Sequence, residues 1–477
     1  LQDPLPVDPE VQQYELENGL TVWIKHHETP PDQVGMWLHV GTGSLNETDE
    51  QRGLAHFLEH LAFNGTENFP PGTLIKFFES IGLRFGQHQN AFTSFDQTVY
   101  QLTLPNTEEE TIDKGLLCLA DFAHRMLLTE EEVEKERGVI MEEMRARKGA
   151  GQRVWEALLP IMLPESRVAE RRPIGKAETV ANMERELFVE YYTRWYRPEL
   201  STLIVVGDVE PDEMIKAVRK QFGSWKRPEP VPEPAEPGVE PYEKVRTAIV
   251  TDPELTEAEA SVISIRPLEP DDTVGDMRRS TVDHLALWII DRRLSNMVQA
   301  GTAPFQEANF YKGPFINVAT YVGADATGQP EKWREITTSL LTEIKRARVH
   351  GLRANELEDA KKALLARLEQ AARTEGTRSM RAVLSGLNSV AARGNKPISA
   401  AQELDLTGKL MPGITLEDVN AALRDSFTPG RRLVLLTMPE RDDLPTPDDA
   451  TIREVAMAAE ATEVKPLAER KRATALM

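Results

Sequence analysis

Short runs of β-branched and aromatic residues alternate with longer amphipathic segments along the front part of the chain. Residues 20–25, 35–40 and 201–207 are such runs bounded by turn formers, which is the pattern of β-strands. Residues 92–104 alternate well enough to form one or two further strands. Helices are predicted over residues 53–63, 72–81, 111–128, 130–147 and 188–195.

The rear part repeats this alternation, with a strand predicted over residues 316–322 and long helices over 273–298, 332–349 and 355–373. Another helix opens at Thr415, with Asp418 placed three residues on in a near capping-box arrangement. The two parts also end alike, because a short apolar strand follows a helix within residues 198–211 and again within 429–439. These matching ends indicate an internal duplication.

The clearest boundary is the proline-rich segment 228–241, PEPVPEPAEPGVEP. Prolines at this density exclude helix and sheet interiors and favour an extended spacer. We therefore expect a front domain of residues 1–227, this linker, and a second domain of residues 242–477. The predicted fold class is α+β, with two similar domains that each pack helices on a mostly antiparallel sheet.

Composition and charge narrow the classes of function. The chain of 477 residues is 40% hydrophobic and 28% charged. Its apolar runs stay below the ~20 residues needed to cross a bilayer, so we expect no membrane span. A formal charge of −21 argues against a nucleic-acid partner. The acidity serves solubility, and it also suits the attraction of basic peptides.

The single cysteine and the first residues add two further expectations. Cys118 excludes an intrachain disulfide, and its apolar surroundings predict an inert thiol in the core. Residues 1–11 lack an initiator methionine, a basic head and an apolar signal core. This start suits either a mature N-terminus left after removal of a signal or an artificial boundary.

The chemistry of the chain concentrates in the sequence HFLEH, which contains His56, Glu59 and His60. In a helix, positions i and i+4 share a face with i+3 beside them. Two imidazoles so placed can bind one metal ion, and the carboxylate then points at its open position. This is the H-x-x-E-H order, the reverse of H-E-x-x-H. Apolar neighbours predict a buried helix, in which these polar groups need a partner such as a metal.

A catalytic zinc commonly takes three protein ligands, so a third group must come from elsewhere in the chain. The candidate is the acidic stretch 130–143, EEEVEKERGVIMEE. Most of its carboxylates suit a solvated helix face, while Glu132, Glu136 and Glu143 flank the more apolar face. The pattern alone does not choose among these three.

The sequences GLAHFLEHLAFNGT and ERGVIMEE resemble those of the M16 metallopeptidases, which include pitrilysin, insulin-degrading enzyme and the mitochondrial processing peptidases. The resemblance implies that His56, His60 and Glu136 bind zinc, because Glu136 lies near the family's spacing from the second histidine. It also implies that Glu59 is the general base that activates water for peptide hydrolysis.

A second segment of the resemblance is NAFTSFDQTVY, which contains Asn90 and Ala91. In the family this pair lies on an edge strand to which the substrate peptide adds as a further strand. The segment departs from the family at Gln87-His88-Gln89, where a small or acidic residue is expected. His88 is interpreted as a surface residue, or as a titrating group near the cleft.

Within the family, LAHFLEHLAFNGTENFP, ESIGLRFG and RRPIG resemble the bacterial PqqL-like zinc proteases. This implies a periplasmic or otherwise exported protein, with a cytoplasmic one as the alternative. Family peptidases enclose the substrate between two halves of two domains each, and this chain supplies one half of that clamshell. A complementary half would then be a same-chain continuation, a separate subunit or a second copy.

The resemblance implies a zinc-dependent endopeptidase acting on short or unfolded polypeptides. One alternative is a weakly active or non-catalytic peptide-binding half of a two-part complex, which the intact HFLEH and Glu136 disfavour. Another is a metal-dependent hydrolase of non-peptide substrates, which the Asn90-Ala91 edge strand disfavours.

Overall fold

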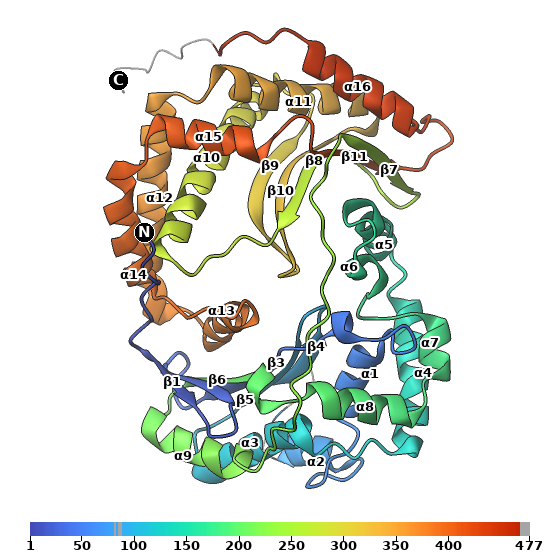
Figure 1. Ribbon diagram of the computed structural model, residues 1–477, viewed down its shortest axis with the longest axis vertical. Helices are drawn as coiled ribbons and strands as arrows, with labels where there is room; N and C mark the ends of the chain where they lie inside the picture. The colour runs from blue at the N-terminus through green and yellow to red at the C-terminus, as the bar shows by residue number, and fades with distance from the viewer. Residues whose placement is uncertain (81–82, 84–87, 468–477) are drawn as a thin grey trace.

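The computed structural model describes residues 1–80, 83 and 88–467 as two lobes stacked along the long axis (Figure 1). Each lobe consists of one sheet and the helices packed on it. The last residue of the predicted helix 72–81, Gln87 of the predicted departure and most of the segment ESIGLRFG lie outside the described residues.

The first sheet has six strands in the order β1-β2-β6-β3-β5-β4. Neighbouring strands are antiparallel, except that β2 and β6 run parallel. The strands are β1 (Val11–Glu15), β2 (Thr21–His26), β3 (Val34–Val40), β4 (Gln89–Thr93), β5 (Thr98–Leu104) and β6 (Ser201–Gly207). The helices of this part are α1 (Leu54–Leu61), α2 (Thr73–Ser80), α3 (Glu109–His124), α4 (Glu130–Ala146), α5 (Ala150–Met162), α6 (Arg167–Glu170), α7 (Ala177–Asn182), α8 (Arg185–Trp195) and α9 (Pro211–Phe222).

The second sheet has five strands in the order β7-β11-β8-β10-β9, again antiparallel except for the pair β7 and β11. The strands are β7 (Arg246–Asp252), β8 (Ala258–Pro267), β9 (Glu307–Phe315), β10 (Ala319–Gly328) and β11 (Leu433–Pro439). The helices are α10 (Val274–Gln299), α11 (Trp333–His350), α12 (Ala354–Thr374), α13 (Met380–Ala392), α14 (Ala400–Leu410), α15 (Leu416–Ser426) and α16 (Asp449–Ala461).

The two sheets share one topology. The order β2-β6-β3-β5-β4 of the first sheet recurs as β7-β11-β8-β10-β9 in the second, with the parallel pair in the same place. In both sheets the first strand of the second hairpin, β4 or β9, lies at the edge. The prediction of an α+β fold with two similar, mostly antiparallel domains is therefore confirmed.

The predicted helix start at Thr415 is confirmed, whereas the predicted start of the strand 316–322 is corrected. Thr415 caps α15 with a reciprocal pair of bonds, since its amide donates to Asp418 and the Asp418 amide donates to the Thr415 hydroxyl. The strand predicted over 316–322 begins too early, because Ile316 and Asn317 have φ of 53° and 52° and turn the chain between β9 and β10.

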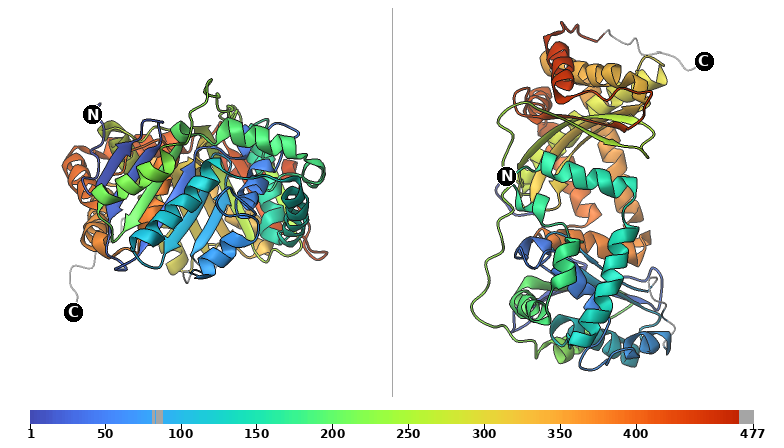
Figure 2. Two further views of the ribbon diagram at one scale, coloured as in Figure 1. Left: turned by 90° about the horizontal axis from the view of Figure 1, so that it is seen from below. Right: turned by 90° about the vertical axis from the view of Figure 1, so that its right-hand side faces the viewer.

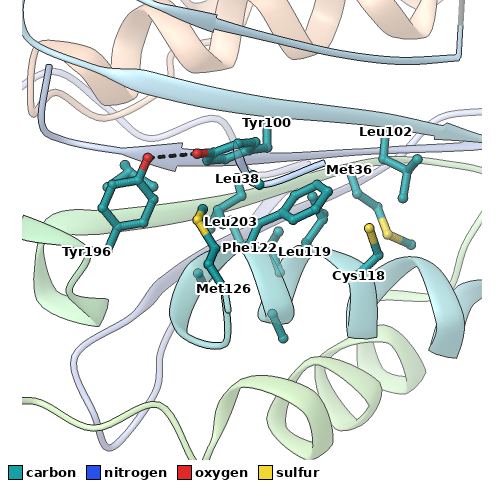
Figure 3. Packing of buried hydrophobic residues seen from close by; sticks show 14 of the residues in the cluster. Met36, Leu38, Tyr100, Leu102, Cys118, Leu119, Phe122, Met126, Tyr196 and Leu203 are labelled. Atoms are coloured by element: carbon teal, nitrogen blue, oxygen red, sulfur yellow. Dashed lines mark hydrogen bonds between the residues drawn. The ribbon is translucent and has the colours of Figure 1, made fainter. Parts of the chain in front are cut away.

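The core of the first lobe lies between the sheet and α3. Leu38 and Leu102 face Leu119 and Phe122 there, and the Tyr100 and Tyr196 hydroxyls are 2.7 Å apart (Figure 3). Cys118 is fully buried in this cluster as a free thiol, as the sequence predicts. Among the described residues, none of the helices is both long and apolar enough to cross a membrane.

Each half of the chain lends a helix to the other half's sheet. Helix α13 from the rear half packs on β3 and β6 of the first sheet, and α5 from the front half packs on β7 of the second (Figure 1). Residues 225–245, which contain the proline-rich linker, form neither helix nor strand and run along the outside of the molecule (Figure 2). The domain boundaries at this linker stay a prediction, because helices cross between the lobes on either side of it.

Candidate active site

Helix α1 carries the motif histidines and packs against α4 and the edge strand β4. It follows Gly53, whose φ of 100° favours glycine, and seven of its eight residues are buried. His56 and Glu59 are each 6% exposed, and the His60 side chain is 25% exposed. The two imidazole rings meet edge to face with their centres 4.8 Å apart. The helix therefore places both rings and the carboxylate on one face, as the spacing predicts.

Three side-chain atoms converge in this site. The Nε2 atoms of His56 and His60 lie 3.7 Å and 3.4 Å from Oε2 of Glu143, and all three atoms lie within 4.8 Å of one another. Ligands around a tetrahedral zinc are ~3.4 Å apart at the usual bond lengths of 2.0–2.2 Å. The two histidines and Glu143 thus have the chemistry of a metal site, and the distances from Glu143 to both rings are close to those around tetrahedral zinc.

Glu136, the ligand implied by resemblance, occupies a different place. Its Oε1 lies 2.9 Å from Nδ1 of His60, on the far side of the ring from Nε2, and its Oε2 accepts a 2.6 Å bond from Asn64. A carboxylate bound to Nδ1 orients the imidazole and selects the tautomer whose Nε2 lone pair is free. The geometry therefore disfavours Glu136 as the third ligand and favours Glu143.

The third acidic candidate, Glu132, lies near the start of α4. It is buried, its carboxylate pairs with Lys135 at 3.3 Å, and its amide donates to the Thr129 hydroxyl that caps the helix. The described residues that line the candidate site do not include it.

The surroundings set the charge of each group. Burial, and then the neighbouring His60, lowers the pKa of His56 to about 4, which keeps this ring neutral and able to donate a lone pair. Burial also opposes the protonation of His60, but its bonds to Glu136 and Glu143 raise its pKa to about 9. The bond to His60 holds the pKa of Glu143 at about 2. A metal bound here would have to displace a proton from His60.

Glu59 has the properties of a general base. Burial raises its pKa to about 7, opposed by the bond from Thr93. The Thr93 hydroxyl, at the end of β4, donates to Oε2 of Glu59 over 2.7 Å, and Glu59 lines the cavity of the site. A carboxylate with a pKa near neutrality both accepts and returns a proton readily.

A cavity of about 430 Å³ joins these groups to the free edge of the first sheet. Its lining brings together His56, Glu59, His60, Asn64, Glu136, Glu143 and Arg147 with Asn90, Ala91, Phe92 and Thr93 of β4. The structure thus gathers the residues that the resemblance implies for the site, together with Glu143, while Glu132 is not among the described residues of this lining.

Ala91 presents its backbone to this cavity. The bonds Ser94 N–H to Gln97 and Thr103 N–H to His88 show that the even-numbered residues of β4 bond to β5. The amide of Ala91 therefore points to the free edge, where the side chain of Asn90 accepts it at 3.0 Å. His88 is half-buried at the start of this strand and is not among the described residues that line the cavity.

Comparison with known proteins shows which family the chain belongs to. Residues 22–169 match the family model described as insulinase (peptidase family M16), and residues 182–364 match the model described as the peptidase M16 inactive domain. The chain belongs to the M16 peptidase family. The second M16 match begins before the proline-rich linker and extends through α11 into α12.

Among its M16 relatives, the chain is 30% identical over 427 residues to the probable zinc protease PqqL of Escherichia coli, which covers 87% of this chain and 45% of that protein. It is 25% identical over 446 residues to the corresponding Haemophilus influenzae protein, covering 91% and 47%. It also resembles the crystal structure of the first half of the periplasmic protease PqqL from Escherichia coli, with a TM-score of 0.91, 26% identity, and coverage of 98% and 100%. The chain spans about half the length of the curated relatives it matches.

Several site residues were not identified from the sequence. Thr93 directly follows the Asn90-Ala91-Phe92 segment, and Asn64 lies just after α1, so both belong to the motifs of the resemblance, which give them no role. Their contribution depends on how a strand and a turn meet the helix in space, which spacing along the chain does not encode.

Proposed function

We propose that this chain is the metal-bearing unit of a zinc-dependent endopeptidase that hydrolyses short or unfolded polypeptides. The observation that carries the proposal is the convergence of His56, His60 and Glu143 beside a buried Glu59 and a free strand edge. Glu143 replaces Glu136 in the proposed ligand set. The family and the zinc-protease names of its relatives agree with this chemistry.

A zinc ion held by these three residues would polarise the scissile carbonyl and make a water molecule more acidic. His56 is neutral in the fold, while His60 would give up its proton at Nε2 and keep the proton that Nδ1 donates to Glu136. Glu136 and Asn64 then fix the orientation of the His60 ring.

Glu59 moves the proton during hydrolysis. Because Thr93 holds Oε2, Oε1 is the oxygen that takes a proton from the attacking water and passes it to the leaving amine. The free edge of β4 would hold the peptide by main-chain bonds through Ala91, with little demand on its side chains. Only an extended, flexible chain can add to such an edge.

We further propose a periplasmic protein that works with a complementary M16 half. Two observations support this: the relatives are about twice as long as the matched region, and the Escherichia coli PqqL whose structure the chain resembles is a periplasmic protease. A second half facing the open cavity would add donors for the developing oxyanion and would position the substrate.

The test measures zinc content and peptide turnover of the chain and of Glu59→Gln, each with and without a complementary half. We expect Glu59→Gln to keep zinc and to lower turnover by at least a hundredfold, because it removes the base and spares the ligands. Turnover within tenfold of the parent would rule out Glu59 as the base. A parent chain that binds peptide and zinc yet stays inactive with its other half would instead support a non-catalytic peptide-binding unit.

A further inference from the structure

Helix α1 begins without a capping side chain of its own. Its N-cap residue is Gly53, which has no side chain, and the amides of the first turn need acceptors from elsewhere. Leu54 donates its amide to the Gln51 carbonyl at 2.7 Å. The remaining bonds at this end come from a carboxylate six residues upstream of Gly53.

Glu47 supplies these bonds. Its side chain is fully buried, its Oε2 accepts the Gly53 amide at 3.0 Å, and its Oε1 accepts the Ala55 amide at 2.8 Å. Ala55 directly precedes His56. The single carboxylate of Glu47 therefore binds two amides of the first turn of α1, and the second of these belongs to the residue before His56.

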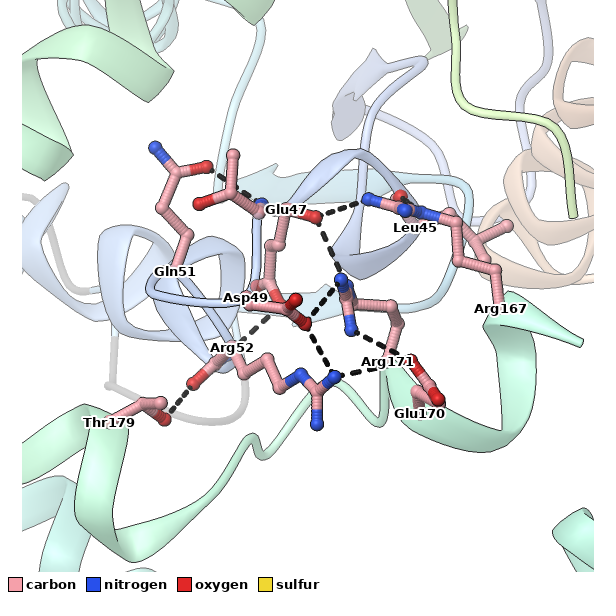
Figure 4. Close-up of polar contacts among 11 residues, drawn as sticks. Leu45, Glu47, Asp49, Gln51, Arg52, Arg167, Glu170, Arg171 and Thr179 are labelled. Carbon is pink, nitrogen blue, oxygen red and sulfur yellow. Dashed lines mark hydrogen bonds and ion pairs between the residues drawn. The ribbon is translucent and has the colours of Figure 1, made fainter. Parts of the chain in front are cut away.

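The main chain of Glu47 is itself held from another element. Arg171 donates Nε to the Glu47 carbonyl at 3.0 Å, and Arg167 donates to the same carbonyl and to that of Leu45 (Figure 4). Arg167 is the first residue of α6 and Arg171 directly follows that helix, and Arg171 also pairs with Asp49 of the Glu47 loop at 2.9 Å. Buried charge-assisted bonds of this kind fix a position strongly, because breaking one leaves a charge without a partner.

We propose that Glu47 is a positioning residue for the metal centre, which sets the height and rotation of α1 so that His56 and His60 meet Glu143. The inference rests on the proposed function, and it assigns Glu47 no contact with metal or substrate. The ligands come from two helices, since the histidines lie on α1 and Glu143 lies on α4. Their spacings of 3.4 Å and 3.7 Å survive only if α1 stays within ~0.5 Å of its place against α4.

A cap that serves stability alone and a cap that positions the ligands have different consequences. The first lowers the stability of the fold and leaves the zinc affinity of folded molecules unchanged. The second weakens zinc binding in molecules that remain folded, because the ligand atoms no longer converge.

The experiment compares zinc affinity, by competition with a chelator, and the visible spectrum of the cobalt-substituted protein in Glu47→Gln and in the parent. Glutamine keeps the shape but turns an amide donor toward one of the two backbone amides. Burial raises the pKa of Glu47 to about 8, so the measurement is made at pH 8.5, where the carboxyl group of the parent is mostly ionised. We expect a 10- to 100-fold loss of zinc affinity, the range for groups that orient ligands, and an altered cobalt spectrum.

Two matched variants make the result specific. Glu50→Gln changes an exposed carboxylate of the same loop and should leave both readouts at parent values. His60→Ala should abolish zinc binding. If His60→Ala loses zinc while Glu47→Gln matches the parent, the positioning role is overturned and the metal site stands. If His60→Ala also keeps zinc, the proposed function itself fails.

A second measurement covers the case in which Glu47→Gln does not fold. In the parent protein, metal and cap should favour the same conformation of α1, so zinc should slow hydrogen exchange at the Gly53 and Ala55 amides at least tenfold. Equal exchange of these two amides with and without zinc would overturn the proposal.

Discussion

At the scale of single residues, Glu136 and Glu143 show how closely two roles can resemble one another in sequence. They stand seven residues apart on α4, which is two helical turns, so both carboxylates face α1. Glu136 reaches Nδ1 of His60, while Glu143 reaches Nε2 of both histidines. In the proposed site, Glu143 would bind the metal beside Nε2, and Glu136 would orient His60 through the other ring nitrogen.

We expect Glu143→Gln to lower zinc affinity by more than a hundredfold, because it removes the charged ligand atom. Glu136→Gln should lose only about 10- to 100-fold, since the His60 ring keeps its lone pair and loses orientation. Chelator competition on the purified variants measures both.

The matched control for this pair is Glu142→Gln. Its carboxylate lies on the same helix but is exposed and pairs with Arg145, so its zinc affinity should equal that of the parent. The reverse order, with Glu136→Gln losing the metal and Glu143→Gln retaining it, would restore the ligand implied by resemblance.

The limits of sequence reasoning are clear at this site. The spacing of His56, Glu59 and His60 predicts a shared helix face, and the structure has that face. The choice between Glu136 and Glu143 depends on the position of α4 along the axis of α1, which is set by packing between elements distant in sequence. The sequence does not predict the role of Glu47 for the same reason. Glu47 lies six residues before Gly53, outside the positions at which a capping side chain is expected.

At the scale of elements, strand β4 carries both Thr93, which binds the proposed base Glu59, and an open main-chain edge. Thr93 binds Glu59, and two residues earlier the Ala91 amide faces the cavity. The side chain of Asn90 accepts that amide, so a peptide strand added to this edge would have to displace it. In the proposed function, this short strand would therefore couple peptide binding to the orientation of Glu59.

We expect Ala91→Pro to raise KM for peptides roughly five- to tenfold, which corresponds to the loss of one main-chain hydrogen bond of ~1 kcal/mol. Proline is tolerated on an edge strand where the amide does not enter the ladder. Steady-state kinetics and thermal unfolding measure the two effects separately.

Phe92 is the matched control on β4. By the alternation of this strand its amide bonds to β5, so Phe92→Pro should destabilise the fold, whereas Ala91→Pro should not. An unchanged KM in a folded Ala91→Pro variant would contradict strand addition at this edge.

At the scale of the whole molecule, the two lobes are joined by exchanged helices as well as by the linker. The sequence predicts the linker from its prolines and the repeat from its matching ends, and the sheets share one topology. It does not predict the exchange, because α5 and α13 are amphipathic segments whose partner sheet is not encoded locally. Trp23 and Trp37 of the first sheet pack against α13. The apolar residues on this face are therefore buried by a helix that lies more than 300 residues later in the chain.

One buried histidine makes this docking sensitive to acid. His39 on β3 lies 3.1 Å from the Asn388 side-chain oxygen on α13, and Asn388 in turn donates to Gln97 at 3.0 Å. Burial lowers the pKa of His39 to about 4, against the opposing effect of its bonds to Asn388 and Gln97. The unfolded chain, with a pKa of ~6.5, binds the proton more readily than the folded one.

The sign of the pH dependence follows from this difference. The contribution of His39 to stability is complete above pH ~6.5 and is lost as the pH falls towards 4, which amounts to about 2 kcal/mol at pH 5. We therefore expect the parent to lose more stability than His39→Gln between pH 7 and pH 5, as measured by denaturant unfolding. Hydrogen exchange in α13 should accelerate over the same range in the parent only.

His124 is the control, because burial also lowers its pKa to about 4, yet it stacks on Trp225 on the opposite side of the sheet. His124→Gln should reduce the global loss but leave the acid-induced exchange in α13 intact. Parallel pH profiles for the parent and His39→Gln would show that this histidine does not link the lobes.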